Sequence, residues 1–158
     1  MPATNPATPA KVFSAAVLPT GERDFQVGWS LGADVRRDEA PLASDVDGDG
    51  VAERVQLSSG GLCVLSADGA ARWCAPPQWQ PWEAALDDVD DDGLAELVVL
   101  AQQNEEWGPA WGTFVQVWEW RDGRFSLLWR SPADDYRRVW LADADGDGTR
   151  DIGVDEGG

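Results

Sequence analysis

Asp88-Val89-Asp90-Asp91-Asp92-Gly93-Leu94-Ala95-Glu96 places acidic residues at positions 1, 3, 5 and 9 of a nine-residue stretch, with glycine at position 6. The apolar run Leu97-Val98-Val99-Leu100 follows at once. The same pattern begins at Asp45 and again at Asp143, and each copy leads into a run typical of a β-strand. Three copies in a chain of 158 residues indicate a structural repeat rather than one solvated turn.

The spacing of these acidic residues is that of a cation-binding loop. Carboxylates at positions 1, 3 and 5 can point inward together only if the chain turns sharply, and glycine at position 6 permits the positive φ that this turn needs. Like charges at such short range repel, so the loop is expected to order around a hard divalent cation. Oxygen ligands select Ca²⁺ over zinc or copper, and the sequence contains no histidine.

An EF-hand is the competing kind of calcium loop, and two features of the sequence argue against it. An EF-hand loop needs Glu at position 12, where the three copies carry Gln56, Val99 and Val154. EF-hand loops also lie between helices, whereas the residues after each copy alternate as strands do.

The pattern D-x-D-x-D-G-x-x-[DE] followed by a strand resembles the FG-GAP or VCBS repeat of integrin-α-like β-propellers. The resemblance implies an all-β fold whose propeller blades have four antiparallel strands, each with Ca²⁺ in the loop between its first and second strands. The family usually has Asp at position 9, where two copies here carry Glu, and the Phe-Gly and Gly-Ala-Pro signatures are absent. The implied ligands of three calcium ions are Asp45, Asp47, Asp49, the Val51 carbonyl and Glu53; Asp88, Asp90, Asp92, the Leu94 carbonyl and Glu96; and Asp143, Asp145, Asp147, the Thr149 carbonyl and Asp151.

Strand and turn signals recur with a period near 50 residues, which fits four short strands per unit. Hairpin turns are expected at Thr20-Gly21, Asp68-Gly69 and Asp122-Gly123. In the family's blade order, three blades fill residues 12–158 after a Pro/Ala/Thr-rich linker at 1–11. The expected strands are 40–44, 54–57, 62–66 and 71–74 in the first blade, 82–86, 97–101, 114–120 and 125–129 in the second, and 138–142 and 152–154 in the third.

The third blade lacks its outer pair of strands, and the N-terminal hairpin 12–29 is a pair of the right kind. Three blades do not close a ring, because propellers typically have four to eight. We expect two chains to join head to tail into a six-bladed homodimer, each hairpin completing the other chain's last blade. The alternatives are a filament built by the same contact, a fragment of a larger propeller, and a hairpin that folds back on its own chain.

The two cysteines bear on the cellular compartment. A hairpin that turns at Asp68-Gly69 places Cys63 opposite Cys74, so a disulfide is expected, with two buried free thiols as the alternative. A disulfide together with calcium loops predicts a secreted, cell-surface or periplasmic protein. Residues 1–10 have no apolar core typical of a signal peptide, and no apolar run approaches the roughly 18 residues of a membrane span.

The chain is strongly acidic, with a formal net charge of −17. Three bound calcium ions would leave a net charge of about −11, which argues against nucleic acid or an anionic membrane surface as a partner. The 12 basic residues are scattered along the sequence without forming a patch.

Ten tryptophans are many for 158 residues, and nine of them fall into two groups. Trp118 and Trp120 share one face of a strand, so we expect them to pack between blades. Trp29, Trp73 and Trp129 each follow a hairpin turn, and this matching position predicts repeated core packing. The tryptophans assigned to loops either bind a sugar or protein partner or cover the blade ends and the oligomer joint; they are Trp79, Trp82, Trp107 and Trp111.

Catalysis is not expected from this sequence. It has no histidine, no Gly-x-Ser-x-Gly motif and no plausible cysteine nucleophile, and most clustered carboxylates are assigned to metal. A glycosidase pair among Glu105, Glu106, Asp134 and Asp135 is the enzymatic alternative. The expected function is a non-catalytic, calcium-stabilised extracellular binding or adhesion module for a protein or carbohydrate. The alternative is a structural subunit of a surface filament.

Overall fold

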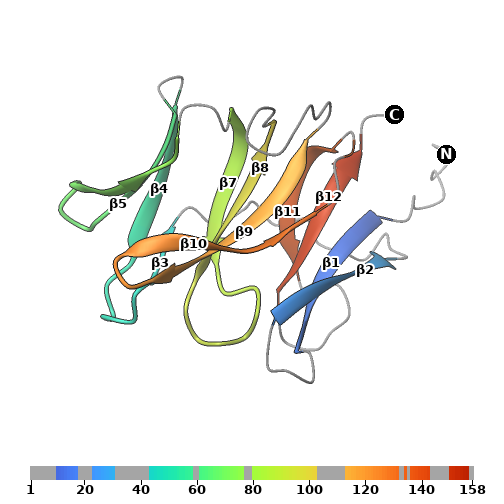
Figure 1. Ribbon diagram of the computed structural model, residues 1–158, viewed down its shortest axis with the longest axis horizontal. Helices are drawn as coiled ribbons and strands as arrows, with labels where there is room; N and C mark the ends of the chain where they lie inside the picture. The colour runs from blue at the N-terminus through green and yellow to red at the C-terminus, as the bar shows by residue number, and fades with distance from the viewer. Residues whose placement is uncertain are drawn as a thin grey trace, which may run out of the picture.

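The computed structural model describes residues 10–17, 23–30, 43–58, 61–76, 80–102, 113–131, 134, 136–142 and 150–156. These residues form twelve β-strands in three four-stranded antiparallel sheets, and they include no helix (Figure 1). The predicted all-β class is therefore confirmed. The described part of the chain accordingly contains no helix of the length and hydrophobicity needed to cross a membrane.

Two sheets follow the order of the chain. Sheet 1 consists of β3 (Ala43–Ser44), β4 (Glu53–Ser58), β5 (Gly61–Leu65) and β6 (Ala71–Cys74). Sheet 2 consists of β7 (Pro81–Asp87), β8 (Glu96–Ala101), β9 (Phe114–Arg121) and β10 (Arg124–Arg130). In both sheets each strand pairs with the next one in sequence, as the repeat pattern predicts.

Sheet 3 joins the two ends of the described chain. Its order is β11 (Tyr136–Ala142), β12 (Asp151–Glu156), β1 (Ala10–Val17) and β2 (Arg23–Ser30). β1 pairs with β12, so that Val12 lies opposite Gly153. The hairpin thus folds back on its own chain, which differs from the exchange between two chains expected above. β1 also begins at Ala10, inside the segment expected to be a linker.

The three sheets stand side by side, with sheet 2 in the middle (Figure 1). All six residues of β8 are buried, because alternate side chains face different neighbours. Leu97 and Val99 pack with residues of sheet 1, whereas Val98 and Leu100 pack with residues of sheet 3. A strand buried on both faces needs a continuous apolar sequence, and this explains the run after Glu96.

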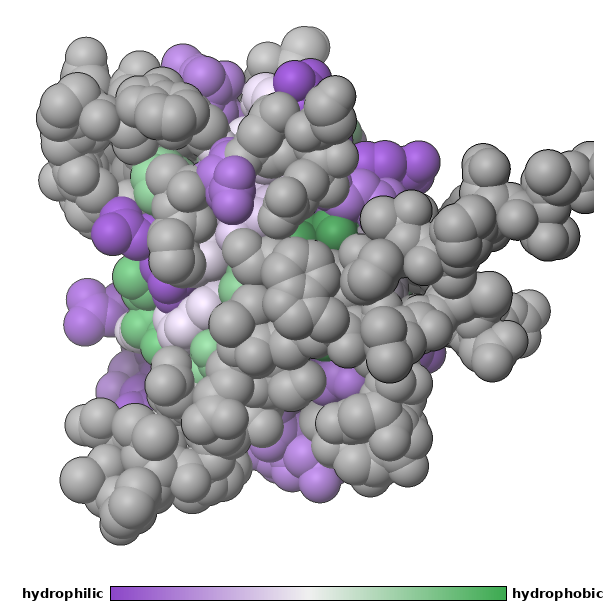
Figure 2. All heavy atoms as spheres, turned by 90° about the vertical axis from the view of Figure 1, so that its right-hand side faces the viewer, coloured by the Kyte–Doolittle hydropathy of each residue, from purple (hydrophilic) through white to green (hydrophobic). Residues whose placement is uncertain are grey.

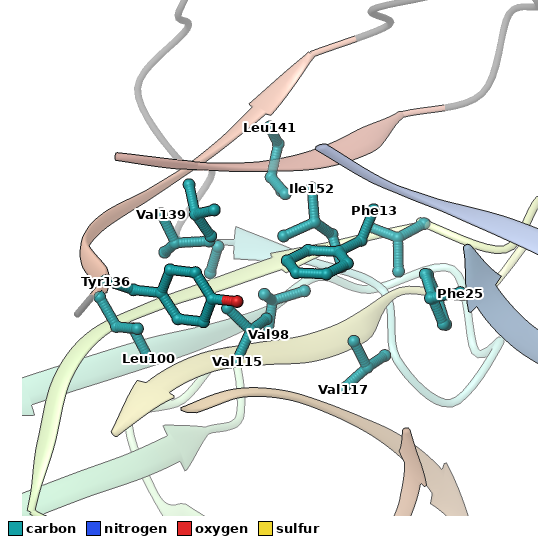
Figure 3. Packing of buried hydrophobic residues seen from close by; sticks show 13 residues of the cluster. Phe13, Phe25, Val98, Leu100, Val115, Val117, Tyr136, Val139, Leu141 and Ile152 are labelled. Atoms are coloured by element: carbon teal, nitrogen blue, oxygen red, sulfur yellow. The ribbon is translucent and has the colours of Figure 1, made fainter. Parts of the chain in front are cut away.

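The core between sheets 2 and 3 is aliphatic and aromatic. Phe13, Tyr136 and Ile152 from sheet 3 pack against Val98 and Val115 from sheet 2 (Figure 3). The Tyr136 ring meets the Phe13 ring edge-on at 6.3 Å between centroids. Because β1 supplies Phe13, burial of this side chain against sheet 2 stabilises the position of the N-terminal hairpin in sheet 3.

Tryptophans after the hairpin turns repeat one contact between neighbouring sheets. Trp73 on β6 lies 5.0 Å from Phe125 on β10, and Trp129 on β10 lies 4.9 Å from Phe13 and 5.1 Å from Phe25, measured between ring centroids. Each such tryptophan therefore packs on an aromatic residue of the next sheet, which confirms core packing for these two. Trp118 and Trp120 also pack against the cluster between sheets 1 and 2, as predicted.

The outer face of sheet 1 is polar along β4, whereas β5 contributes Leu65 and the Cys63–Cys74 disulfide to the same face. Along β4, Val55 is buried toward sheet 2, whereas Arg54, Gln56 and Ser58 are exposed on the opposite face. Figure 2 looks onto the other end of the row, where the described atoms show hydrophilic margins and only small, separate hydrophobic areas. A polar outer face is typical of a repeat that ends an array.

Candidate metal centre

Two of the three acidic loops lie within the described residues, and both join the first and second strands of a sheet. The first connects β3 to β4, and the second connects β7 to β8. In each loop four carboxylates offer ligand atoms that all lie within 4.8 Å of one another. The two clusters are Asp45, Asp47, Asp49 and Glu53, and Asp88, Asp90, Asp92 and Glu96.

Backbone hydrogen bonds hold the first loop in a tight turn. The Asp45 carboxylate accepts bonds from the backbone N–H groups of Gly48 (2.8 Å) and Gly50 (2.9 Å). Asp49 accepts a bond from the Val51 N–H at 2.8 Å, and Glu53 accepts one from the Val46 N–H at 3.2 Å. The carboxylates are thereby oriented by the loop itself.

The second loop repeats these bonds at the same spacings. Asp88 accepts a bond from the Gly93 N–H at 2.8 Å, Asp92 from the Leu94 N–H at 2.9 Å, and Glu96 from the Val89 N–H at 2.9 Å. Gly93 has a φ of 88°, and its counterpart Gly50 has a φ of 83°. These values are the left-handed conformation for which glycine was expected at position 6.

Position 4 of the loop is also left-handed, which the sequence analysis did not anticipate. Gly48 has a φ of 80° there, and Asp91 has a φ of 61°. The glycines at position 4 of the first and third copies were the available signal. Asp91 is exposed and is not among the four clustered carboxylates of its loop.

The ninth position of each copy begins the strand that follows the loop. Glu53, Glu96 and Asp151 are the first residues of β4, β8 and β12, and each pairs with the last residue of the preceding strand. All three are buried, with exposures of 2%, 1% and 1%. In the third copy, position 9 therefore also begins a strand. Residues 143–149 of this copy lie outside the described residues; they include Asp143, Asp145, Asp147 and Thr149.

Burial and mutual crowding disturb the carboxylates of the second loop. Burial, together with Asp92, raises the pKa of Asp90 to about 7. Burial, together with the charge of Asp90, raises the pKa of Glu96 to about 10. A bound divalent cation would relieve both effects, and a set of donors made only of oxygen suits a hard cation. Either cluster could therefore hold a metal ion.

A basic side chain from another strand enters the first cluster. Arg72 on β6 places Nη1 2.5 Å from Asp47 Oδ2 and 3.9 Å from Glu53 Oε1. Burial acts to raise the pKa of Asp47, but hydrogen bonds from Arg72 and from the Asp49 N–H outweigh it and lower the pKa to about 2. Burial raises the pKa of Glu53. Arg72 lies outside the repeated acidic pattern, so its position at this cluster could not be predicted from that pattern.

Neighbouring loops are also connected to one another. The Ala95 N–H donates a hydrogen bond of 2.9 Å to the backbone carbonyl of Asp45, which links the second loop to the first. Arg150, next to the third loop, places Nε 3.2 Å from Asp87 Oδ2, immediately before the second loop. The two described acidic loops and Arg150 therefore lie close together along the row of sheets.

The remaining predicted sites have mixed outcomes. Cys63 and Cys74 lie opposite each other on β5 and β6 and form a disulfide, as predicted. Trp82 was predicted both to begin the strand 82–86 and to belong with the loop tryptophans; it lies in β7, at an irregularity of the β7–β8 pairing, and is 42% exposed. Asp134 is exposed and pairs with Thr113 through an isolated β-bridge. The remaining predicted residues lie outside the described part of the chain; they are Trp79, Glu105, Glu106, Trp107, Trp111 and Asp135.

Comparison with known protein families matched residues 88–154 to the FG-GAP-like repeat. The matched segment begins at the first carboxylate of the second loop and ends in β12. Neither the curated proteins nor the solved structures gave a match. The acidic loop, the apolar strand after it and this match agree that residues 88–154 are similar to the FG-GAP-like repeat.

Proposed function

We propose that the protein is a non-catalytic, calcium-binding module of β-propeller type that binds a protein or carbohydrate partner outside the cell. The observation that carries the proposal is the second cluster, where Glu96 is 1% exposed among three further carboxylates. Buried like charges are costly unless a cation compensates them. Calcium is the favoured ion because it accepts six to eight oxygen ligands in flexible geometry.

In this proposal, calcium bound at the loops stabilises the packing of neighbouring sheets. Each loop connects two strands of one sheet, and the Ala95 to Asp45 hydrogen bond ties two loops together. Calcium ions that order each of these two loops therefore also stabilise the position of sheet 1 against sheet 2. A scaffold stiffened in this way can present loops and exposed side chains to a partner at low entropic cost.

The disulfide supports an extracellular location. Disulfides persist in oxidising compartments and are rare in the cytosol. Cys74 is exposed and Cys63 is half-buried, so cellular reductants would have access to this bond.

Calcium removal tests the proposal directly. Native mass spectrometry should detect bound calcium, and thermal unfolding should begin at least about 5 °C lower in EDTA, since a saturating ligand stabilises the state that binds it. Magnesium added back at the same concentration should restore less stability, because Mg²⁺ demands tighter octahedral geometry. Equal melting temperatures with and without EDTA would rule out the calcium-stabilised module.

Partner binding needs a separate test. Trp82 is the described member of the proposed tryptophan set, and exposed indoles can stack on sugar rings or anchor a protein. A glycan array followed by tryptophan fluorescence titration should identify a carbohydrate ligand, and Trp82→Ala should weaken its binding. Trp120→Phe is the control, because Trp120 is partly buried against the core between sheets 1 and 2.

A further inference from the structure

We propose that Arg72 is a built-in competitor of calcium at the first loop, so that the two clusters differ in affinity and the second loop fills first. The inference rests on the proposed calcium-binding function and adds regulation to it. The first loop would then respond to calcium concentrations at which the second loop is already saturated.

Arg72 is held at the first loop by contacts on two sides. Its Nη1 lies 2.5 Å from Asp47 Oδ2 and 3.9 Å from Glu53 Oε1. Its Cζ lies 5.2 Å from the centroid of the Trp120 ring, a distance typical of a cation–π contact. Sheet 1 supplies the arginine and sheet 2 supplies the tryptophan, so the packing of the two sheets positions the guanidinium.

The guanidinium pairs with two of the four proposed ligands. The Asp47 side chain is 17% exposed and that of Arg72 is 32% exposed, so water only partly screens this pair. A calcium ion that coordinates Asp47 and Glu53 must either displace Arg72 or bind close to its positive charge. Both routes reduce the net gain from calcium binding at this loop.

The second loop differs in burial and in its nearby arginine. Asp90 is 5% exposed, whereas its counterpart Asp47 is half-buried. The ion pair of Arg150 at this loop goes to Asp87, which precedes the first ligand. Four carboxylates, two of them buried, bind a divalent cation more tightly than four carboxylates that share an arginine, because affinity follows the charge of the ligand set.

Calorimetric titration of the metal-free full-length chain with Ca²⁺ tests the proposal. Arg72→Gln should raise the affinity of the first loop by roughly tenfold. The background variant that combines Asp90→Asn and Asp145→Asn weakens the second loop and the expected third loop, and so assigns the remaining transition to the first. Arg54→Gln is the matched control, because it removes the same charge from the exposed outer face of the same sheet.

The outcomes separate the inference from the function it rests on. Calcium binding with unchanged or lower first-loop affinity in Arg72→Gln, or an equal gain in Arg54→Gln, would overturn the inference and leave the proposed function standing. Absence of calcium binding in every variant would overturn both. If Arg72→Gln does not fold, Arg72→Lys takes its place; its ammonium lacks the planar fork that fits a carboxylate, and a gain of about threefold is expected.

Discussion

Asp90 and Asp91 are neighbours in the second loop with opposite environments. Asp90 is buried and belongs to the four-carboxylate cluster, whereas Asp91 is exposed at the left-handed position 4. We therefore predict that Asp90→Asn weakens calcium binding at this loop by at least tenfold, because one ligand charge is lost. Asp91→Asn removes the same charge outside the cluster and should change the affinity less than threefold. Titration calorimetry on both variants measures the difference, and equal losses would contradict the ligand assignment.

Glu96 makes the stability of the metal-free protein depend on pH. Its pKa is raised to about 10 by burial and by the charge of Asp90, so the folded state binds this proton more tightly than the unfolded chain does. Its stabilising contribution is full below the ordinary glutamate pKa and is lost as pH rises toward 10. We predict that, in EDTA, the melting temperature falls from pH 5 to pH 8.

Calcium should reverse that dependence, because protons compete with the metal for the carboxylates. With excess calcium the melting temperature should rise from pH 5 to pH 8. The glutamine in Glu96→Gln has no carboxyl proton to lose, so the melting temperature of this variant in EDTA should change less with pH. The same slope with and without calcium would show that the Glu96 carboxyl does not take part in metal binding.

The loop residues could be predicted from the sequence because a cation loop is a local object. All four ligands of a cluster lie within nine residues, and the glycine at position 6 marks the turn. Arg72 could not be predicted in this way, since it reaches Asp47 from 25 residues further along the chain. Nothing in the periodicity of β6 distinguishes it from the exposed Arg54.

Strand patterns were equally informative where burial leaves a periodic trace. β4 alternates between buried Val55 and exposed Arg54 and Gln56, whereas β8 is apolar throughout because both of its faces are covered. The partner of the N-terminal hairpin leaves no such trace. β1 presents the same edge to β12 of its own chain as it would to β12 of a second chain, so local sequence cannot choose between them.

The Trp140 side chain on the neighbouring strand leaves no space for a side chain at Gly153 on β12. A Cβ atom at this position would lie 2.1 Å from the indole ring of Trp140, which is opposite it on β11 and is buried. Gly153→Ala should therefore destabilise the protein by about 1–3 kcal/mol through overpacking. Urea unfolding measures this loss. In a double-mutant cycle with Trp140→Phe, the two losses should be less than additive, and strict additivity would contradict the steric cause.

The whole molecule is a row of three sheets with a covered middle and two ends. Sheet 2 contributes to both hydrophobic clusters, and a hydrogen bond between the two described acidic loops connects sheets 1 and 2. A ring of propeller type would require a further sheet or a second chain to cover the outer faces. Association with a second copy is therefore a proposal, and such a copy would pack against the outer face of sheet 1.

That outer face favours a monomer. A second chain that continued the row would pack against this outer face and bury Arg54 and Gln56. These residues alternate along β4 with Val55, which faces sheet 2 on the inner side. Polar groups buried without partners destabilise an interface, so we predict a mass of 17.1 kDa by light scattering at micromolar concentration. The double variant Arg54→Leu and Gln56→Leu makes the face apolar and should promote association. About twice the monomer mass for the unaltered protein would instead support the head-to-tail dimer.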